Sequence, residues 1–275
     1  MSEKLSDDIT NILQAIKKHG YVKIPKVFSE ITMADTLSEV KRLQTEYAEK
    51  SIGSLPKLDQ GQEVIYNLQN KSALLTKLLL SHSLIKNILC ATLNDQWHQA
   101  IPLDQGNYIL RSFLARNNQV ATPMHIDSYI PYQGDFPLSM QVSIILEAQT
   151  AENGCTLLVP GSHQSGEYVQ QSDREKSIDI ESAVGDVVIW DSRIWHGTNE
   201  NSTEQSRWSL IGTFVRWWIK QGYQITEQLP NAIYQTLNDE EKAIMGYCSR
   251  PFKDEKEGID FKTGFDALPK RTTSN

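Results

Sequence analysis

The sequence predicts an α+β protein whose core is a double-stranded β-helix, the jelly-roll (cupin-like) arrangement, flanked by N-terminal helices. Two observations support this class. Up to about residue 105, apolar residues recur at helical spacing, whereas residues from about 106 to 220 form short alternating segments separated by turn residues. Helices first and strands afterwards favour an α+β architecture over alternating parallel units.

The helical part begins at Ser6-Asp7-Asp8, residues that favour a helix start, and His19-Gly20 predicts the end of this first helix. Residues 21–25 alternate in polarity and therefore predict a short strand. Two further helices are predicted over residues 31–47 and 72–93 from the spacing of their apolar residues.

Five strands are predicted in the core, over residues 108–115, 138–146, 155–159, 186–190 and 207–217. The C-terminal part, residues 221–275, should hold one helix that begins at Asn238, because Glu241 stands three positions on as a capping-box partner. The polar tail from residue 253 is predicted to be irregular. Since no internal repeat or low-complexity linker interrupts the chain, we expect residues 1–275 to form a single domain.

Composition narrows the class of protein. Hydrophobic residues make up 39% of the chain, enough for a core, and its net charge of −7 argues against general nucleic-acid binding, which needs surplus cations. Polar residues interrupt the apolar stretch 74–93, and the N-terminus lacks an apolar run, so we expect no membrane span or signal peptide. The sparse cysteines provide no disulfide framework. We expect a cytoplasmic monomer or homodimer that acts on a small molecule.

One histidine is followed two positions later by a carboxylate, in His125-Ile126-Asp127. In an extended chain these two side chains point to the same face and can hold one metal ion. By itself the pair does not require a metal, because a hydrogen-bonded His-Asp pair at a strand end has the same spacing. A further histidine, His196, follows the predicted strand 186–190, and two histidines with one carboxylate form the facial arrangement typical of non-haem iron(II) and O₂ chemistry.

Arg207 follows His196 after a polar, turn-forming segment, so the two flanking strands should fold back as a hairpin. Inside a barrel, its guanidinium needs an anion, and its planar fork suits a carboxylate. A dicarboxylic 2-oxo acid fits, with one end on the metal and the other on Arg207, and Ser209 on the same strand face can add a hydroxyl. The alternative is a surface arginine paired with Glu200 or Glu204.

Taken together and in order, four segments resemble the phytanoyl-CoA dioxygenase-like family of Fe(II)/2-oxoglutarate oxygenases. The resemblance extends over about residues 10–220, and the segments are His125-Ile126-Asp127, residues 153–163, residues 185–197 and Arg207-Trp208-Ser209. It implies a jelly-roll core with His125, Asp127 and His196 as iron ligands. It also implies that Arg207 anchors 2-oxoglutarate, with Thr198 and Ser209 as helpers. Gln141 either faces this cosubstrate or points to solvent.

The resemblance further implies hydroxylation of a C–H bond in a small or mid-sized organic substrate, with O₂ consumed and succinate and CO₂ released. Asp127 is present where the halogenases of the family have a small residue, which favours hydroxylation. Two alternatives remain: a non-catalytic cupin-like binding protein, and a Zn- or Mn-dependent hydrolase with the same ligands. No role is assigned to Arg111, to His163, or to the loops 128–137 and 163–180.

Overall fold

The computed structural model describes residues 2–48, 62–259 and 264–271. The chain divides into two compact units: residues 1–66 with 113–212, and residues 67–112 with 213–275. The boundary between them falls within the strands β3 (Ile109–Asn118) and β10 (Ser209–Val215). A single domain over residues 1–275 stays a prediction.

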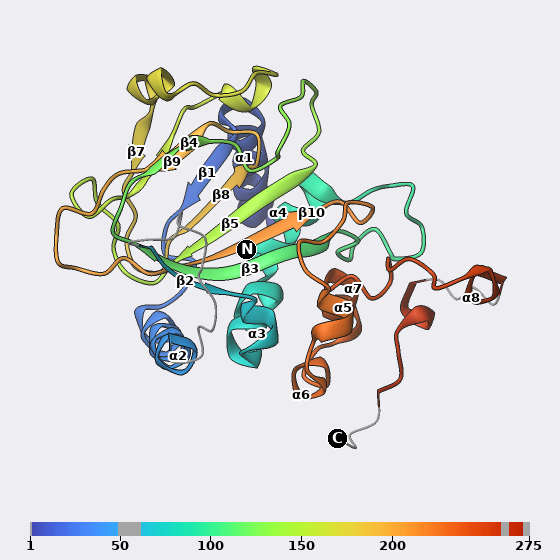
Figure 1. Cartoon of the computed structure of the whole chain (residues 1–275). Coiled ribbons are helices and arrows are strands. Elements are labelled where there is room, and N and C mark those ends of the chain that lie inside the picture. Colours follow the sequence, from blue (N-terminus) through green and yellow to red (C-terminus); the bar gives the residue numbers. More distant parts are fainter. Residues whose placement is uncertain (1, 49–61, 260–263, 272–275) are drawn as a thin grey trace. The chain divides into compact units, whose positions relative to one another are not determined.

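The strands form two sheets, as the jelly-roll prediction requires (Figure 1). The six-stranded sheet has the order β1-β8-β5-β10-β3-β2, and the four-stranded sheet has the order β4-β9-β6-β7. The remaining strands are β1 (Tyr21–Ile24), β2 (Gln62–Tyr66), β4 (Thr122–His125), β5 (Ser139–Ile145), β6 (Thr156–Leu158), β7 (Ile178–Ile180), β8 (Val187–Asp191) and β9 (His196–Thr198).

The core of the first unit lies between its two sheets. In the register of the larger sheet, Tyr21, Trp190 and Gln141 are cross-strand partners, so their side chains share one face. Trp190 packs in a buried apolar cluster with residues of the smaller sheet, and Tyr21 packs against that cluster. The cluster consists of Leu158, Ile180, Val188, Trp190 and Ile194. Gln141 therefore faces the interior of the jelly roll.

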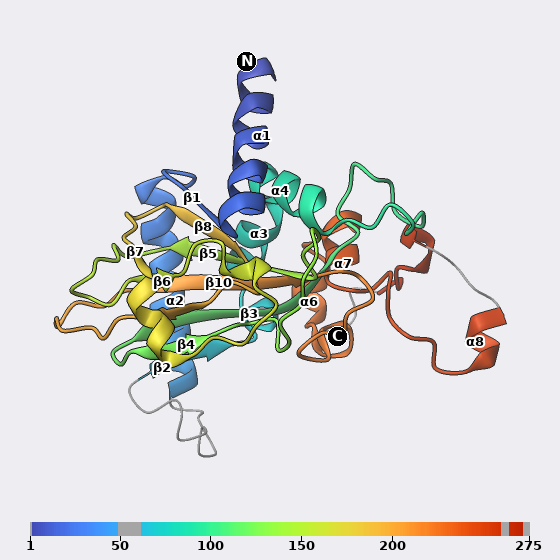
Figure 2. The ribbon, with the colours of Figure 1, turned by 90° about the horizontal axis from the view of Figure 1, so that it is seen from above.

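Two helices belong to the first unit. The helix α1 (Ser2–His19) contacts β1 and β8 and projects away from the sheet at its N-terminal end (Figure 2). It begins earlier than the predicted start at Ser6, and it ends as predicted at Gly20, whose φ of 84° suits a glycine. The helix α2 (Glu30–Ala48) contacts β2 and confirms the helix predicted over 31–47.

In the second unit, the single helix predicted over 72–93 is wrong. Two helices, α3 (Ala73–Ser81) and α4 (Ser83–Leu93), meet at His82, whose backbone is extended, and they are bent by 63°. The helix α3 buries leucines and α4 buries both leucines and isoleucines, so packing overrides the continuous apolar spacing. No single helix in the described ranges is long and apolar enough to cross a membrane, although this bent pair reaches that length and hydropathy together.

The C-terminal helix α7 (Asp239–Ile244) begins as predicted. Asn238 accepts a hydrogen bond from the Glu241 N–H at 2.8 Å, and Glu241 accepts one from the Asn238 N–H at 2.8 Å. The irregular tail predicted from residue 253 is wrong in part, because it contains two short helices. The remaining helices are α5 (Ile225–Gln228), α6 (Asn231–Tyr234), α8 (Glu255–Ile259) and the 3₁₀ turns η2 (Leu68–Asn70), η3 (Ser162–Gln164), η4 (Gln171–Lys176) and η5 (Gly264–Ala267).

Four short strands escaped prediction: β2, β4, β7 and β9 have three to five residues each, too few for alternation to be recognised. The strand predicted over 108–115 also continues to Asn118. Asn117 and Asn118, whose composition is typical of a turn, pair with Glu63 and Gln62 of β2. This extension brings residues 116–118 into the sheet, and it matters for the site below.

Gly185 precedes β8 in a conformation that only glycine adopts readily. Its φ is 85°, its carbonyl accepts a hydrogen bond from the Phe28 N–H at 3.1 Å, and an added Cβ would overlap the Phe28 carbonyl oxygen. We expect Gly185→Ala to lower the free energy of unfolding by about 2 kcal/mol or more, measured by urea unfolding. Gly258→Ala in α8 is the control, since its Cβ meets only ordinary contacts. Equal stability of both variants would contradict this account.

Candidate metal centre and its anion site

The pairing of β4 with β9 brings two histidines together. His125, the last residue of β4, is the Cα partner of His196, the first residue of β9, and their ring centroids lie 4.1 Å apart. Asp127 follows β4, where its N–H donates to the Ser192 carbonyl at 2.8 Å. Ligand atoms of the three side chains all lie within 4.8 Å of one another. Among the described residues, no other group of three or more such side chains is arranged to hold a metal ion.

Backbone carbonyls set the tautomer of both imidazoles. His125 Nδ1 lies 2.8 Å from the Pro123 carbonyl, and His196 Nδ1 lies 3.0 Å from the Ile194 carbonyl. Since a carbonyl only accepts, each Nδ1 carries the proton and each Nε2 keeps a free lone pair. These Nε2 atoms lie 3.5 Å and 3.3 Å from the two oxygens of Asp127. The donor set therefore faces one point and fits a divalent first-row metal ion.

Electrostatics keep the carboxylate ionised. Burial acts to raise the pKa of Asp127, but the two imidazoles outweigh burial and hold that pKa well below its ordinary value. Burial acts to lower the pKa of His125, but the hydrogen bond and charge of Asp127 raise it overall. The side chain of His196 is 8% exposed, whereas that of His125 is 38% exposed, so the triad is open on the side of His125.

Arg207 is buried and lacks an acidic partner. Its Nε donates to the Asn118 carbonyl at 3.0 Å, its backbone N–H donates to Asn117 Oδ1 at 2.9 Å, and its Nη2 is buried without a hydrogen bond in the described part of the chain. Burial, together with the charge of Arg116, lowers the pKa of Arg207 to about 10. The alternative of a surface arginine required an ion pair with Glu200 or Glu204, and Arg207 forms neither pair. A buried guanidinium in this state fits a carboxylate ligand.

A short chain of contacts connects Arg207 to the triad. Asn118, whose carbonyl holds Arg207, donates from Nδ2 to Thr122 Oγ1 at 3.1 Å, and Thr122 in turn contacts Thr198 Oγ1 at 3.1 Å. Thr198 stands two residues after His196 and also accepts from the Thr122 N–H at 2.9 Å. The Thr198 hydroxyl is thus engaged with β4, so its position supports the strand pair beside the metal ligands.

Ser209 and Gln141 were predicted to bind the cosubstrate, whereas Arg111 and His163 had no assigned role. Ser209 is buried two residues beyond Arg207, and Gln141 is buried with its Nε2 3.4 Å from Ser192 Oγ, so neither points to solvent. Arg111 donates to the Lys220 carbonyl at 2.7 Å within the second unit, and nothing places it at the triad. His163 is buried, with Nε2 3.2 Å from the Lys17 carbonyl, so it packs as a hydrogen-bonded loop histidine.

Side-chain contacts hold each of the two loops beside the triad in place. Arg193 pairs with buried Asp191, donates to the carbonyls of Tyr132 and Gly134, and covers the Tyr132 ring at 4.2 Å, which fixes loop 128–137. Segment 163–180 carries η4 and β7, and the side chain of Gln171 bonds both the N–H and the carbonyl of Met124, next to His125.

Arg116 was not among the predicted site residues. It lies on β3 two residues before Asn118, its Nε is buried without a hydrogen bond, and its charge acts to lower the pKa of both His125 and Arg207. Because the predicted strand stopped at residue 115, Arg116 had no assigned face. Continuing the alternation through Asn117-Asn118 would have placed it beside the site.

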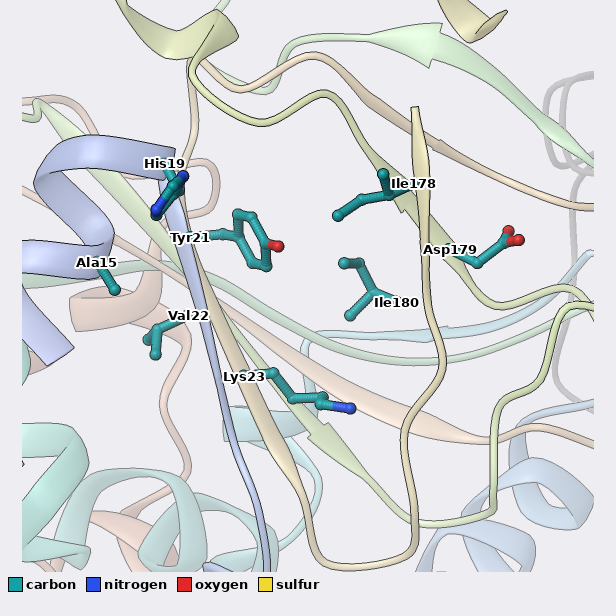
Figure 3. A pocket seen from close by; sticks show the side chains of 8 residues that line it. All are labelled: Ala15, His19, Tyr21, Val22, Lys23, Ile178, Asp179 and Ile180. Atoms are coloured by element: carbon teal, nitrogen blue, oxygen red, sulfur yellow. The ribbon is translucent and has the colours of Figure 1, made fainter. Parts of the chain in front are cut away.

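A separate cavity of about 360 Å³ lies between β1 and β7, the edge strands of the two sheets (Figure 3). Tyr21 faces Ile178 and Ile180 across it, and Lys23 and Asp179 lie at its rim. No residue of the triad lines this cavity, and neither does Arg207.

Comparisons with known proteins agree with this geometry. The profile of the family described as phytanoyl-CoA dioxygenase (PhyH) matches residues 16–209, more than half of the chain. Dioxygenase af480 of Aspergillus fumigatus is 25% identical over 238 residues, which cover 84% of this chain and 74% of that protein.

Solved structures share the fold. The epimerase SnoN, in complex with Fe³⁺, α-ketoglutarate and nogalamycin RO, has a TM-score of 0.62 at 16% identity, covering 82% of this chain and 91% of its own. HygX of Streptomyces hygroscopicus, with nickel, 2-oxoglutarate and hygromycin B bound, has a TM-score of 0.60 at 16% identity, covering 77% and 88%. These likenesses confirm the predicted fold class.

Removing one imidazole should strongly weaken metal binding. We expect His196→Ala to weaken Ni(II) binding, measured by calorimetry, by at least about 100-fold. His19→Ala, which removes an exposed histidine of α1, should bind Ni(II) like the unaltered chain. Unchanged affinity in His196→Ala would remove this residue from the metal centre.

Acid should also weaken metal binding. The pKa of His125 is raised above its ordinary 6.5, so the proton is held at higher pH and competes with the metal there. Asp127, with a depressed pKa, stays ionised and adds nothing in this range. Ni(II) affinity should therefore fall as the pH decreases through the raised pKa of His125. A flat profile between pH values of about 8 and 6 would contradict the ligand role of this residue.

Proposed function

The chain belongs to the phytanoyl-CoA dioxygenase (PhyH) family, and on that premise we propose that it hydroxylates a C–H bond of a small or mid-sized organic substrate. As a dioxygenase of this family, it uses iron(II), 2-oxoglutarate and O₂. When bound, these supply the oxidation: 2-oxoglutarate loses CO₂ and takes one oxygen atom to become succinate, and the second oxygen atom enters the substrate C–H bond as a hydroxyl.

The observation that carries the proposal is the buried, acid-free Arg207 connected to a His-Asp-His triad. The triad alone also suits a Zn or Mn hydrolase, but a hydrolase leaves the guanidinium without a ligand. A dicarboxylic cosubstrate supplies the missing anion and reaches the metal with its other end. SnoN and HygX, whose structures hold small natural products, support a small-molecule substrate.

Each residue has a stated part in this proposal. His125, Asp127 and His196 would hold the iron, and a set of three protein ligands would leave room for cosubstrate and O₂. Arg207 binds the distal carboxylate of 2-oxoglutarate, and Ser209 adds a hydroxyl. Thr198 orients the strand pair, whereas Gln141, beside Ser192, supports the turn that presents Asp127.

Succinate formation tests the function directly. Purified protein supplied with Fe(II), ascorbate, air and 2-oxoglutarate should release succinate, and a panel of small organic molecules should raise that rate. A protein that binds 2-oxoglutarate but forms no succinate with any panel member would favour the non-catalytic binding protein. Purification with tightly bound zinc and no 2-oxoglutarate binding would favour the hydrolase.

Arg207→Gln should separate cosubstrate binding from metal binding. Since the variant loses the charged hydrogen bonds to a carboxylate in a buried site, we expect the Kd of 2-oxoglutarate for the Ni(II)-loaded protein to rise by about 100-fold. The Kd of Ni(II) itself should change by less than about threefold, because Arg207 contacts none of the three ligands. An equal loss of both affinities would contradict the anchor role.

A further inference from the structure

Arg116 is a second guanidinium beside the site, and no acidic residue in the described ranges forms an ion pair with it. It forms no hydrogen bond or ion pair with any residue in the described ranges, and its Nε is buried. Arg116 as a whole is half-buried, and its buried Nε lacks the acceptor that such a donor normally has. The absence of a partner among the described residues points to a ligand.

The strand geometry directs Arg116 toward the triad. Alternation on β3 places Arg116 and Asn118 on the same face, and the side chain of Asn118 reaches Thr122 on β4, the strand that ends in His125. Its electrostatic effect agrees, because the charge of Arg116 acts to lower the pKa of His125 and of Arg207. His125, on which this charge acts, is also the more exposed of the two imidazoles.

A count of formal charges indicates that 2-oxoglutarate does not neutralise Arg116. Iron(II) and two guanidiniums against the one carboxylate of Asp127 leave three formal positive charges in the site. The two carboxylates of 2-oxoglutarate neutralise two of them, one at the metal and one at Arg207. One positive charge therefore remains, which corresponds to that of Arg116.

We propose that Arg116 binds a carboxylate of the primary substrate, so that this enzyme acts on a small organic acid. The proposal rests on the oxygenase function and names its substrate class. Arg116 is a specificity-determining residue in this account: it orients the acid over the open side of the metal, and it discriminates against the neutral amide or ester of the same molecule.

Acetate, the carboxylate common to all such acids, is the first probe. With Ni(II) and 2-oxoglutarate bound, acetate at about 50 mM should raise the Tm by about 2 °C over chloride at equal ionic strength. Arg116→Gln should abolish this shift, Arg116→Lys should keep part of it, and Arg111→Gln, on the opposite face of β3, should keep all of it. An equal shift in Arg116→Gln, or none in the unaltered chain, would overturn the proposal.

The second measurement uses turnover with pairs of carboxylic acids and their primary amides. Only acids should stimulate succinate formation, and Arg116→Gln should lower kcat/KM for each active acid by about 100-fold. The Kd of 2-oxoglutarate should change less than about threefold in this variant. Active amides that are insensitive to Arg116→Gln would refute the assignment.

The two proposals fail in different ways. If Arg116→Gln weakens 2-oxoglutarate as much as Arg207→Gln does, Arg116 belongs to the cosubstrate anchor and the organic-acid proposal is wrong. If the unaltered chain binds no 2-oxoglutarate at all, the oxygenase function fails. The acetate shift of the protein loaded with Ni(II) alone then still shows whether Arg116 is an anion site.

Discussion

The pairing of β4 with β9 is the contact on which the site depends. It makes His125 and His196 cross-strand partners, and the following turn, held by the Ser192 carbonyl, brings Asp127 between them. Each imidazole is oriented by a carbonyl two residues before it in its own chain segment. Backbone contacts therefore position all three side chains of the triad.

The same strands carry the anion site. Thr198 and Thr122 join β9 to β4, and Asn118, at the end of β3, connects this pair to Arg207. Gly154 belongs to this arrangement, because a Cβ there would lie 2.6 Å from the Asn199 carbonyl and 3.1 Å from Arg207 Nε. The Asn153-Gly154 turn thus leaves room for the guanidinium as well as reversing the chain. A shift of either β4 or β9 would displace the metal centre and the anion site together.

Local patterns were enough to predict most of this, and long-range packing explains what they missed. His125-Ile126-Asp127 lies within three residues, and His196 follows an apolar strand, so both are visible in the sequence. The break at His82 and the start of α1 at Ser2 depend on packing or on weak end preferences. Arg116 was missed for a different reason: Asn117-Asn118 has the composition of a turn but is paired by β2, a strand too short to predict.

Charge balance explains why the site is built at a cost to the folded chain. Burying Arg207 without an acid, close to a second guanidinium, opposes folding, as the lowered pKa of Arg207 indicates. An internal glutamate or aspartate would relieve that cost, but it would also occupy the place of the cosubstrate. The positive charge is tolerable because ligand binding neutralises it. Cosubstrate binding should consequently stabilise the fold as well as load the metal centre, since both effects arise from the same unneutralised guanidiniums.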